Sequence, residues 1–112
     1  MHELGVVLEI FDLIEEIMKE QDLKKVSSVT VEVGELSGIL SDYFKECWNA
    51  ARLGGTFDKT ELKLVNIPAA ARCVCGNEYE MTANSRICPK CHKTDYEIIK
   101  GREFMVLSIE AC

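Results

Sequence analysis

The sequence predicts an α+β fold in which two helices pack on a three-stranded sheet, with a cysteine-rich module inserted before the last strand. Apolar residues recur at helical spacing in two segments and alternate with polar residues in others. A separate block, residues 70–99, is rich in polar side chains and cysteines. With 112 residues, 47% of them hydrophobic, the chain suits one compact domain and has little apolar content to spare.

The first helix is predicted over residues 3–20, where apolar residues form a stripe at helical spacing. The stripe consists of Leu4, Val7, Leu8, Phe11, Ile14 and Met18, and it is widened by Ile10, Leu13 and Ile17. We therefore expect a long helix that packs deeply.

The first strand is predicted over residues 29–33, which alternate strictly. Val29, Val31 and Val33 share one face, and Thr30 and Glu32 share the other. Two further strands are expected over residues 60–67 and 103–110. Their inward side chains should be Leu62, Leu64, Met105, Leu107 and Ile109.

A second helix is predicted between the first two strands. Ser41 or Asp42 can cap its start, and it should run to about Leu53, where Gly54 and Gly55 stop it. Its inner face carries Phe44, Cys47, Trp48 and Ala51. Cys47 is expected to be a small core residue rather than a metal ligand.

Four cysteines form two close pairs. One residue separates Cys73 from Cys75, and two residues, including Pro89, separate Cys88 from Cys91. Zinc favours four sulfur ligands from two such pairs, because each pair closes a tight chelate. Pro89 pre-sets the turn of the second pair. The first pair is one residue short, so we expect a tighter or more strained knuckle there.

Other uses of these cysteines fit the residue types. Iron accepts the same four thiolates. Disulfides are disfavoured, because the start of the chain does not resemble a signal peptide and a reducing, cytoplasmic compartment is expected. Cys88, Cys91 and His92 match a haem-attachment pattern, but the chain offers only His2 as a second histidine. Elemental analysis distinguishes zinc from iron.

The cysteines divide the chain into two predicted domains. Residues 70–99 form an inserted zinc-binding domain, and residues 1–69 plus 100–112 form the α+β domain. The apolar residues of the insert are few, chiefly Val74, Tyr79, Met81, Ile87, Tyr96, Ile98 and Ile99. Metal ligation should therefore supply most of the folding free energy of the insert, and removing zinc should unfold it.

The amino terminus offers a second kind of metal site. The amine of Met1 and the amide and imidazole nitrogens of His2 can form fused chelate rings. The amide of Glu3, its carboxylate or a side chain from elsewhere in the chain can complete a plane. Nickel(II) and copper(II) favour such square, nitrogen-rich coordination, whereas zinc gains nothing from that shape. A solvated terminal histidine is the alternative interpretation.

In combination, these motifs resemble the HypA/HybF family of nickel-insertion accessory proteins over essentially the whole chain. The resemblance rests on three features: residues 1–4 at the start of an amphipathic helix, residues 31–38 at the end of a strand, and the paired cysteines. It continues into Gly55, Thr56 and the closing strand at residues 104–110. The departure is the first cysteine pair, which usually encloses two residues in this family.

The resemblance implies a nickel metallochaperone for nickel-iron hydrogenase. According to this resemblance, His2 is the essential nickel ligand. The amino-terminal nitrogen of Met1 and neighbouring backbone nitrogens, such as that of Glu3, join it, and this nickel site lies in the α+β domain. Structural zinc is held by Cys73, Cys75, Cys88 and Cys91. The implied partners are a HypB-type GTPase, the large subunit of the hydrogenase and, for some members, urease accessory proteins.

Charge and chemistry disfavour other classes. A net charge of −6 argues against nucleic acid as a partner. The alternative is a zinc-ribbon nucleic-acid-binding or adaptor module without nickel transfer. No apolar run approaches the roughly 20 residues of a membrane-spanning helix. A four-thiolate site has no open coordination position, so we do not expect an enzyme. A monomer and a homodimer are both compatible with the sequence.

Overall fold

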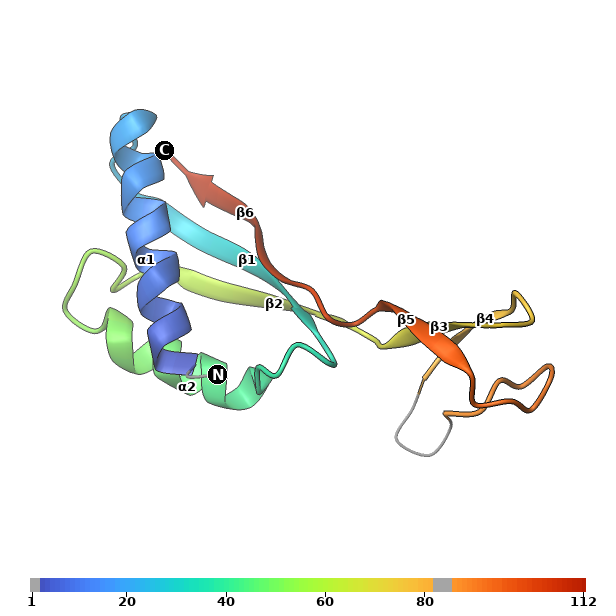
Figure 1. Cartoon of the computed structure of the whole chain (residues 1–112). Helices are drawn as coiled ribbons and strands as arrows, with labels where there is room; N and C mark the ends of the chain where they lie inside the picture. The colour runs from blue at the N-terminus through green and yellow to red at the C-terminus, as the bar shows by residue number, and fades with distance from the viewer. Residues whose placement is uncertain (1–2, 82–85) are drawn as a thin grey trace.

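The computed structural model describes residues 3–81 and 86–112. The molecule is elongated, with dimensions of 54 × 26 × 18 Å and a radius of gyration of 17.6 Å. A compact domain of this length would have a radius of about 13 Å. Figure 1 shows the reason: both helices and one sheet lie at one end, and a second sheet extends away from them. The chain is therefore less compact than its length alone suggests.

The larger end has the predicted arrangement of two helices on a three-stranded sheet. Strand β1 (Val26–Gly34) lies at the centre of this sheet, parallel to β2 (Glu61–Ile67) and antiparallel to β6 (Phe104–Ala111). Parallel neighbours need a crossover connection, and helix α2 (Ser41–Arg52) provides it. Helix α1 (Glu3–Glu20) packs beside α2. Neither of these helices is long and apolar enough to cross a bilayer.

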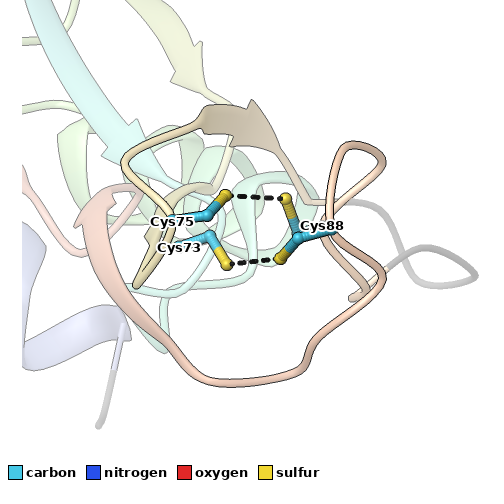
Figure 2. A group of neighbouring side chains, drawn as sticks. Cys73, Cys75 and Cys88 are labelled. Atoms are coloured by element: carbon cyan, nitrogen blue, oxygen red, sulfur yellow. Dashed lines mark hydrogen bonds between the residues drawn. The ribbon is translucent and has the colours of Figure 1, made fainter.

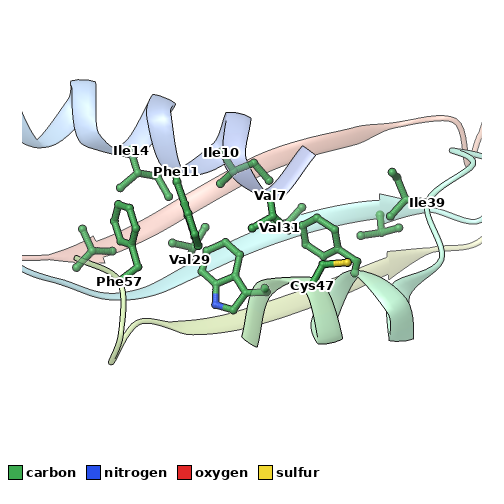
Figure 3. Packing of buried hydrophobic residues seen from close by; sticks show 13 residues of the cluster. Val7, Ile10, Phe11, Ile14, Val29, Val31, Ile39, Cys47 and Phe57 are labelled. Atoms are coloured by element: carbon green, nitrogen blue, oxygen red, sulfur yellow. The ribbon is translucent and has the colours of Figure 1, made fainter. Parts of the chain in front are cut away.

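The core lies between this sheet and the helices. Val29, Val31 and Val33 are all buried, as their alternation predicts, and Cys47 is a buried member of the same cluster. Phe11 connects the layers, because its ring lies 4.9 Å from that of Trp48 and 4.7 Å from that of Phe57. Figure 3 shows Phe11, Val29 and Phe57 packed together. Leu62 and Leu64 also pack against this core, as predicted.

The apolar stripe of α1 is buried less widely than predicted. Leu4, Leu8 and Leu13 are each nearly half exposed. Residues turn by about 100° along a helix, so these leucines flank the buried row on either side. The residues of α1 that are buried in the core form a row centred on Val7 and Ile14.

Two inward positions predicted for β6 are wrong. Met105 and Leu107 are about half exposed, whereas Phe104, Val106 and Ile109 pack against the core. On β1, Thr30 pairs with Ser108 of β6, but the next residue, Val31, pairs with Val106. Leu107, between these two β6 residues, is therefore unpaired. This bulge reverses the alternation along the strand. Ile109, beyond the bulge, faces inward as predicted.

The predicted capping of α2 is also wrong. Leu40, rather than Ser41 or Asp42, occupies the N-cap position, and no side chain of the helix start caps it. The helix ends as expected, because Gly54 adopts a left-handed conformation directly after it, with φ of +71°.

A second sheet forms the other end of the molecule. Its order is β4 (Glu78–Glu80), β3 (Ala70–Cys73) and β5 (Tyr96–Lys100), all antiparallel. A small core of Ala69, Ala71 and Met81 lies beneath Tyr79, Tyr96 and Ile98. On its exposed side, the Arg72 guanidinium contacts both Glu78 and Glu97 at 3.1 Å, so it links the two outer strands.

The chain crosses between the two sheets at residues 67–70 and again at residues 100–104. The end of β1 lies against both crossings. The Leu36 N–H donates to the Gly101 carbonyl at 2.6 Å, and the Ala69 N–H donates to the Glu35 carboxylate at 3.0 Å. Gly34 must be glycine, because a Cβ there would lie 2.2 Å from the Gly101 oxygen. Backbone contacts and the Glu35 carboxylate therefore hold the second sheet on the first.

Candidate metal centre

The four paired cysteines converge at the outer end of the second sheet. Cys73 ends β3, Cys75 follows in the turn before β4, and Cys88 and Cys91 lie in the connection from β4 to β5. Their four sulfur atoms all lie within 4.8 Å of one another. Figure 2 shows Cys73 and Cys75 on one side and Cys88 facing them.

The sulfur separations fit one tetrahedral ion. Cys73 Sγ lies 3.2 Å from Cys91 Sγ, and Cys75 Sγ lies 3.7 Å from Cys88 Sγ. Each close approach thus joins one cysteine of the first pair to one of the second. Zinc–sulfur bonds of about 2.3 Å place tetrahedral sulfurs about 3.8 Å apart. The donor set therefore suits zinc, and iron takes the same ligands.

The first knuckle is a tight turn, as expected from its short spacing. The Cys73 N–H donates to the Asn77 carbonyl at 2.9 Å, and the Gly76 N–H donates to the Cys73 carbonyl at 2.8 Å. Within the turn, the left-handed conformation falls on Gly76, with φ of +91°. Because glycine adopts this conformation at no steric cost, the turn is tight without strain at this position.

The second knuckle is closed by its own backbone. The Cys88 N–H donates to the Lys93 carbonyl at 3.1 Å, and the His92 N–H donates to the Cys88 carbonyl at 2.9 Å. His92 is left-handed, with φ of +63°, a conformation that histidine tolerates better than most residues. Its side chain is exposed and is not among the converging ligands. Cys88, by contrast, is fully buried.

Asn77 adds a contact that the sequence does not single out. Its side-chain amide donates to Cys88 Sγ at 3.5 Å, across the gap between the two pairs. Such donors orient a metal-bound sulfur and stabilise its charge. The only signal in the sequence is the position of Asn77, two residues after Cys75 and directly after the turn glycine.

The surroundings separate the acidities of two of the thiols. Burial would raise the pKa of Cys88, but the N–H groups of Cys91 and Lys90 and the side chain of Asn77 lower it to about 6. The N–H of Cys75 favours the Cys73 thiolate, but burial and the neighbouring sulfurs raise the pKa of Cys73 to about 12. Without a cation, the thiolate is therefore favoured at Cys88 and disfavoured at Cys73.

The predicted nickel ligands Met1, His2 and Glu3 lie at the start of the chain and are not part of the cysteine cluster. Met1 and His2 lie outside the described residues. Glu3 begins α1 and is buried, with only 6% of its surface exposed. Its carboxylate accepts a hydrogen bond from the Leu40 N–H at 3.1 Å. The described residues thus show the Glu3 side chain bound to the start of α2.

Comparison with known proteins gives the fold and the cysteine centre a family. The family described as "Hydrogenase/urease nickel incorporation, metallochaperone, hypA" matches residues 1–111. This chain belongs to the HypA family. The family consists of metallochaperones for nickel incorporation rather than catalytic enzymes, and its role in hydrogenase maturation implies hydrogenase-related partners.

Two relatives and two solved structures show how far the likeness to HypA extends. A protein named hydrogenase maturation factor HypA from Dehalococcoides mccartyi is 32% identical, covering 98% of this chain and 93% of the relative. One of that name from Streptomyces avermitilis is 31% identical, covering 97% and 86%.

The solution structure titled "Ni metallochaperone HypA from Helicobacter pylori" superposes with a TM-score of 0.67 at 28% identity, covering 99% of this chain and 97% of the other. A second HypA solution structure gives 0.72 at the same identity, covering 100% and 97%.

Proposed function

We propose that this chain binds nickel at its amino terminus, holds structural zinc through four cysteines and delivers the nickel to a maturing nickel-iron hydrogenase. The observation that carries the proposal is the family match, which begins at residue 1 and so includes the nitrogen donors of Met1 and His2. The four converging sulfurs support the zinc assignment independently.

The nickel donors are assigned by coordination chemistry. The Met1 amine, the His2 amide and the His2 imidazole form fused chelate rings that suit a planar nickel(II) ion. Glu3 supplies the fourth donor through its backbone nitrogen. Because Glu3 begins α1, its N–H belongs to the first turn of the helix, where backbone donors have no partner within the helix. Amide and imidazole ligands must lose protons, so nickel is held less tightly as the pH falls.

The zinc site has a structural role in this proposal. Cys73, Cys75, Cys88 and Cys91 fill all four positions of a tetrahedral ion and leave none for water or substrate. Zinc bound there would tie the connection from β4 to β5 to the end of β3. The residues of the chain contribute the hydrogen bond of Asn77 and the two closed knuckles.

The partners follow from the same proposal. A HypB-type GTPase docks first, and the large subunit of the hydrogenase receives the nickel. Urease accessory proteins are a second route for nickel in the same family. We place the protein in the cytoplasm, as a monomer or a homodimer.

Calorimetric titration of nickel into zinc-loaded protein tests the proposal. The native chain should bind nickel, and His2→Ala should lose that event while its zinc content, measured by elemental analysis, stays unchanged. Cys47→Ser is a matched control, because Cys47 lies in the core away from the converging cysteines. Equal nickel binding by the native chain and His2→Ala would contradict the proposal.

A further inference from the structure

We propose that the Glu3 carboxylate is a positioning group: it fastens the nickel-binding end of the chain to the start of α2 and is not itself a nickel ligand. The inference rests on the proposed function and assigns a role to one side chain of that site. It separates the two donors that Glu3 offers, the backbone nitrogen and the carboxylate.

The contact that carries the inference joins two chain segments far apart in the sequence. Glu3 Oε2 accepts from the Leu40 N–H at 3.1 Å, across 37 positions. Leu40 holds the N-cap position of α2, where no local side chain provides a cap. The Leu40 side chain is 68% exposed, so the backbone donor, rather than side-chain packing, makes the contact. Glu3 thus satisfies the N–H of the N-cap residue of α2, which no nearby side chain reaches.

Burial makes this contact energetically important. Only 6% of the surface of Glu3 is exposed, and buried polar side-chain atoms need hydrogen-bond partners. Among the residues that the structure describes, no lysine, arginine or histidine forms an ion pair with Glu3. Instead, the carboxylate lies at the start of α1 and accepts from the start of α2. The N-termini of helices carry partial positive charge, so both helices favour the anion in this place.

The receiving segment is itself firmly held. Ile39, next to Leu40, is buried in the core, and its N–H donates to Ser37 Oγ at 3.2 Å. The Phe44 N–H donates to the Leu40 carbonyl at 2.8 Å and closes the first turn of α2. Glu3 is therefore fastened to a part of the molecule with little freedom to move.

The consequence for nickel follows from covalent connection. Glu3 directly follows His2, so fixing Glu3 restricts the backbone from which the proposed nitrogen donors extend. Restricting a ligand set before binding reduces the conformational entropy lost on binding. A carboxylate that turned to the metal would instead leave the Leu40 N–H unpaired in a partly buried place.

Three variants of the full, zinc-loaded chain test the inference by nickel calorimetry and by the visible absorption and circular dichroism of planar nickel. Glu3→Gln keeps an acceptor for the Leu40 N–H and should bind nickel within about twofold of the native chain, with the same spectrum. Glu3→Ala removes the acceptor and should weaken binding about fivefold to tenfold. Glu9→Gln, on the exposed face of α1, is the control for loss of one negative charge.

Removing the donor tests the same bond from its other end. Leu40→Pro deletes the N–H while leaving Glu3 and His2 intact, and the φ of −88° at this position is close to what proline needs. It should weaken nickel binding by about the same factor as Glu3→Ala. Leu40→Ala keeps the N–H and measures any effect of the exposed side chain. Thermal unfolding of each variant establishes that the chain remains folded.

The outcomes distinguish the inference from the function on which it rests. The positioning role would be overturned if Glu3→Ala bound nickel as tightly as the native chain, or if Glu3→Gln shifted the nickel spectrum as far as Glu3→Ala. Either result would leave the proposed nickel site uncontradicted. A native chain without a planar nickel spectrum, or one that His2→Ala reproduces, would overturn the proposed function and the inference together.

Discussion

The side-chain amide of Asn77 lies 3.5 Å from the sulfur of Cys88 and donates to it across the gap between the two cysteine pairs. Cys88 is fully buried, so this donor and the nearby backbone N–H groups take the place of water around its charge. The contact connects the stability of the first turn to the properties of a ligand in the second.

Replacing Asn77 should weaken zinc binding without preventing it. Asn77→Ala removes the donor to Cys88, and loss of such a partner typically costs about tenfold or more in metal affinity. Competition with a chromophoric chelator measures the change, and Asn49→Ala, on an exposed part of α2, is the control. Equal zinc affinities for Asn77→Ala and the control would show that the contact has no influence on the metal.

The uptake of zinc should release a number of protons that depends on pH. In the metal-free chain the pKa of Cys88 is lowered to about 6, so its thiolate is present above that pH and is lost as the pH falls through it. The pKa of Cys73 is raised to about 12, so its thiol releases a proton on binding throughout the neutral range.

Calorimetry in buffers of different ionisation enthalpy counts the released protons. We expect the count to rise by about one between pH 8 and pH 5, because Cys88 becomes protonated over that range. The zinc affinity should correspondingly fall more steeply with decreasing pH below about 6. A constant proton count between those two values would contradict the acidity assigned to Cys88.

Removing zinc should unfold the cysteine turns and spare the larger sheet. Among the residues that the structure describes, the cluster of the second sheet buries Ala69, Ala71 and Met81, which is too small a core to order the turns. In an amide-resolved NMR spectrum, chelator should collapse the dispersion of Gly76 and His92. The amides of Val29 and Val31 in β1 are the internal control. Dispersed Gly76 and His92 signals after complete zinc removal would show that metal is not needed there.

A methyl group at Gly34 should loosen the join between the two sheets. Its Cβ would lie 2.2 Å from the Gly101 oxygen, and backbone atoms cannot move aside as a flexible side chain can. We expect Gly34→Ala to lower the free energy of unfolding by about 3 kcal/mol or more, measured by chemical denaturation. Gly55→Ala is the matched control, because its nearest neighbour lies 3.8 Å away. A similar small change in both variants would contradict the close packing at this crossing.

Much of the larger end could be predicted, because its elements are long and regularly patterned. Val29, Val31 and Val33 face the core together because residues 29–33 alternate in the central strand, which pairs with a neighbour on each side. The limits of α1 match their prediction since its apolar stripe begins and ends with the helix. The apolar stripe of α1 is wider than the face that the core can bury. The prediction therefore overstated the burial of Leu4 and Leu8.

The errors in the predicted fold arise from interactions between distant segments. The bulge that turns Leu107 outward exists only in the pairing of β6 with β1. The N–H of Leu40, the N-cap residue of α2, is bound by Glu3, which no local pattern around Ser41 reveals. The second sheet is built from strands of three to five residues, too short for alternation to distinguish them from loop.

The candidate metal centre also has features that the sequence predicts and features that only the folded structure shows. The spacing of the cysteines predicts that they meet, because each pair is local and one hairpin brings the pairs together. The role of Asn77 and the unequal acidities of Cys73 and Cys88 depend on the folded turns. The backbone of Cys112 also exchanges hydrogen bonds with Lys25, a contact between distant segments that no local pattern indicates.

X-ray absorption at the nickel edge, on protein loaded with one zinc and one nickel, tests the central claim most directly. The account predicts a planar nickel ion surrounded by nitrogen donors, without sulfur, and loss of that signal in His2→Ala. Nickel–sulfur scattering from the cysteine cluster, unchanged in His2→Ala, would contradict it.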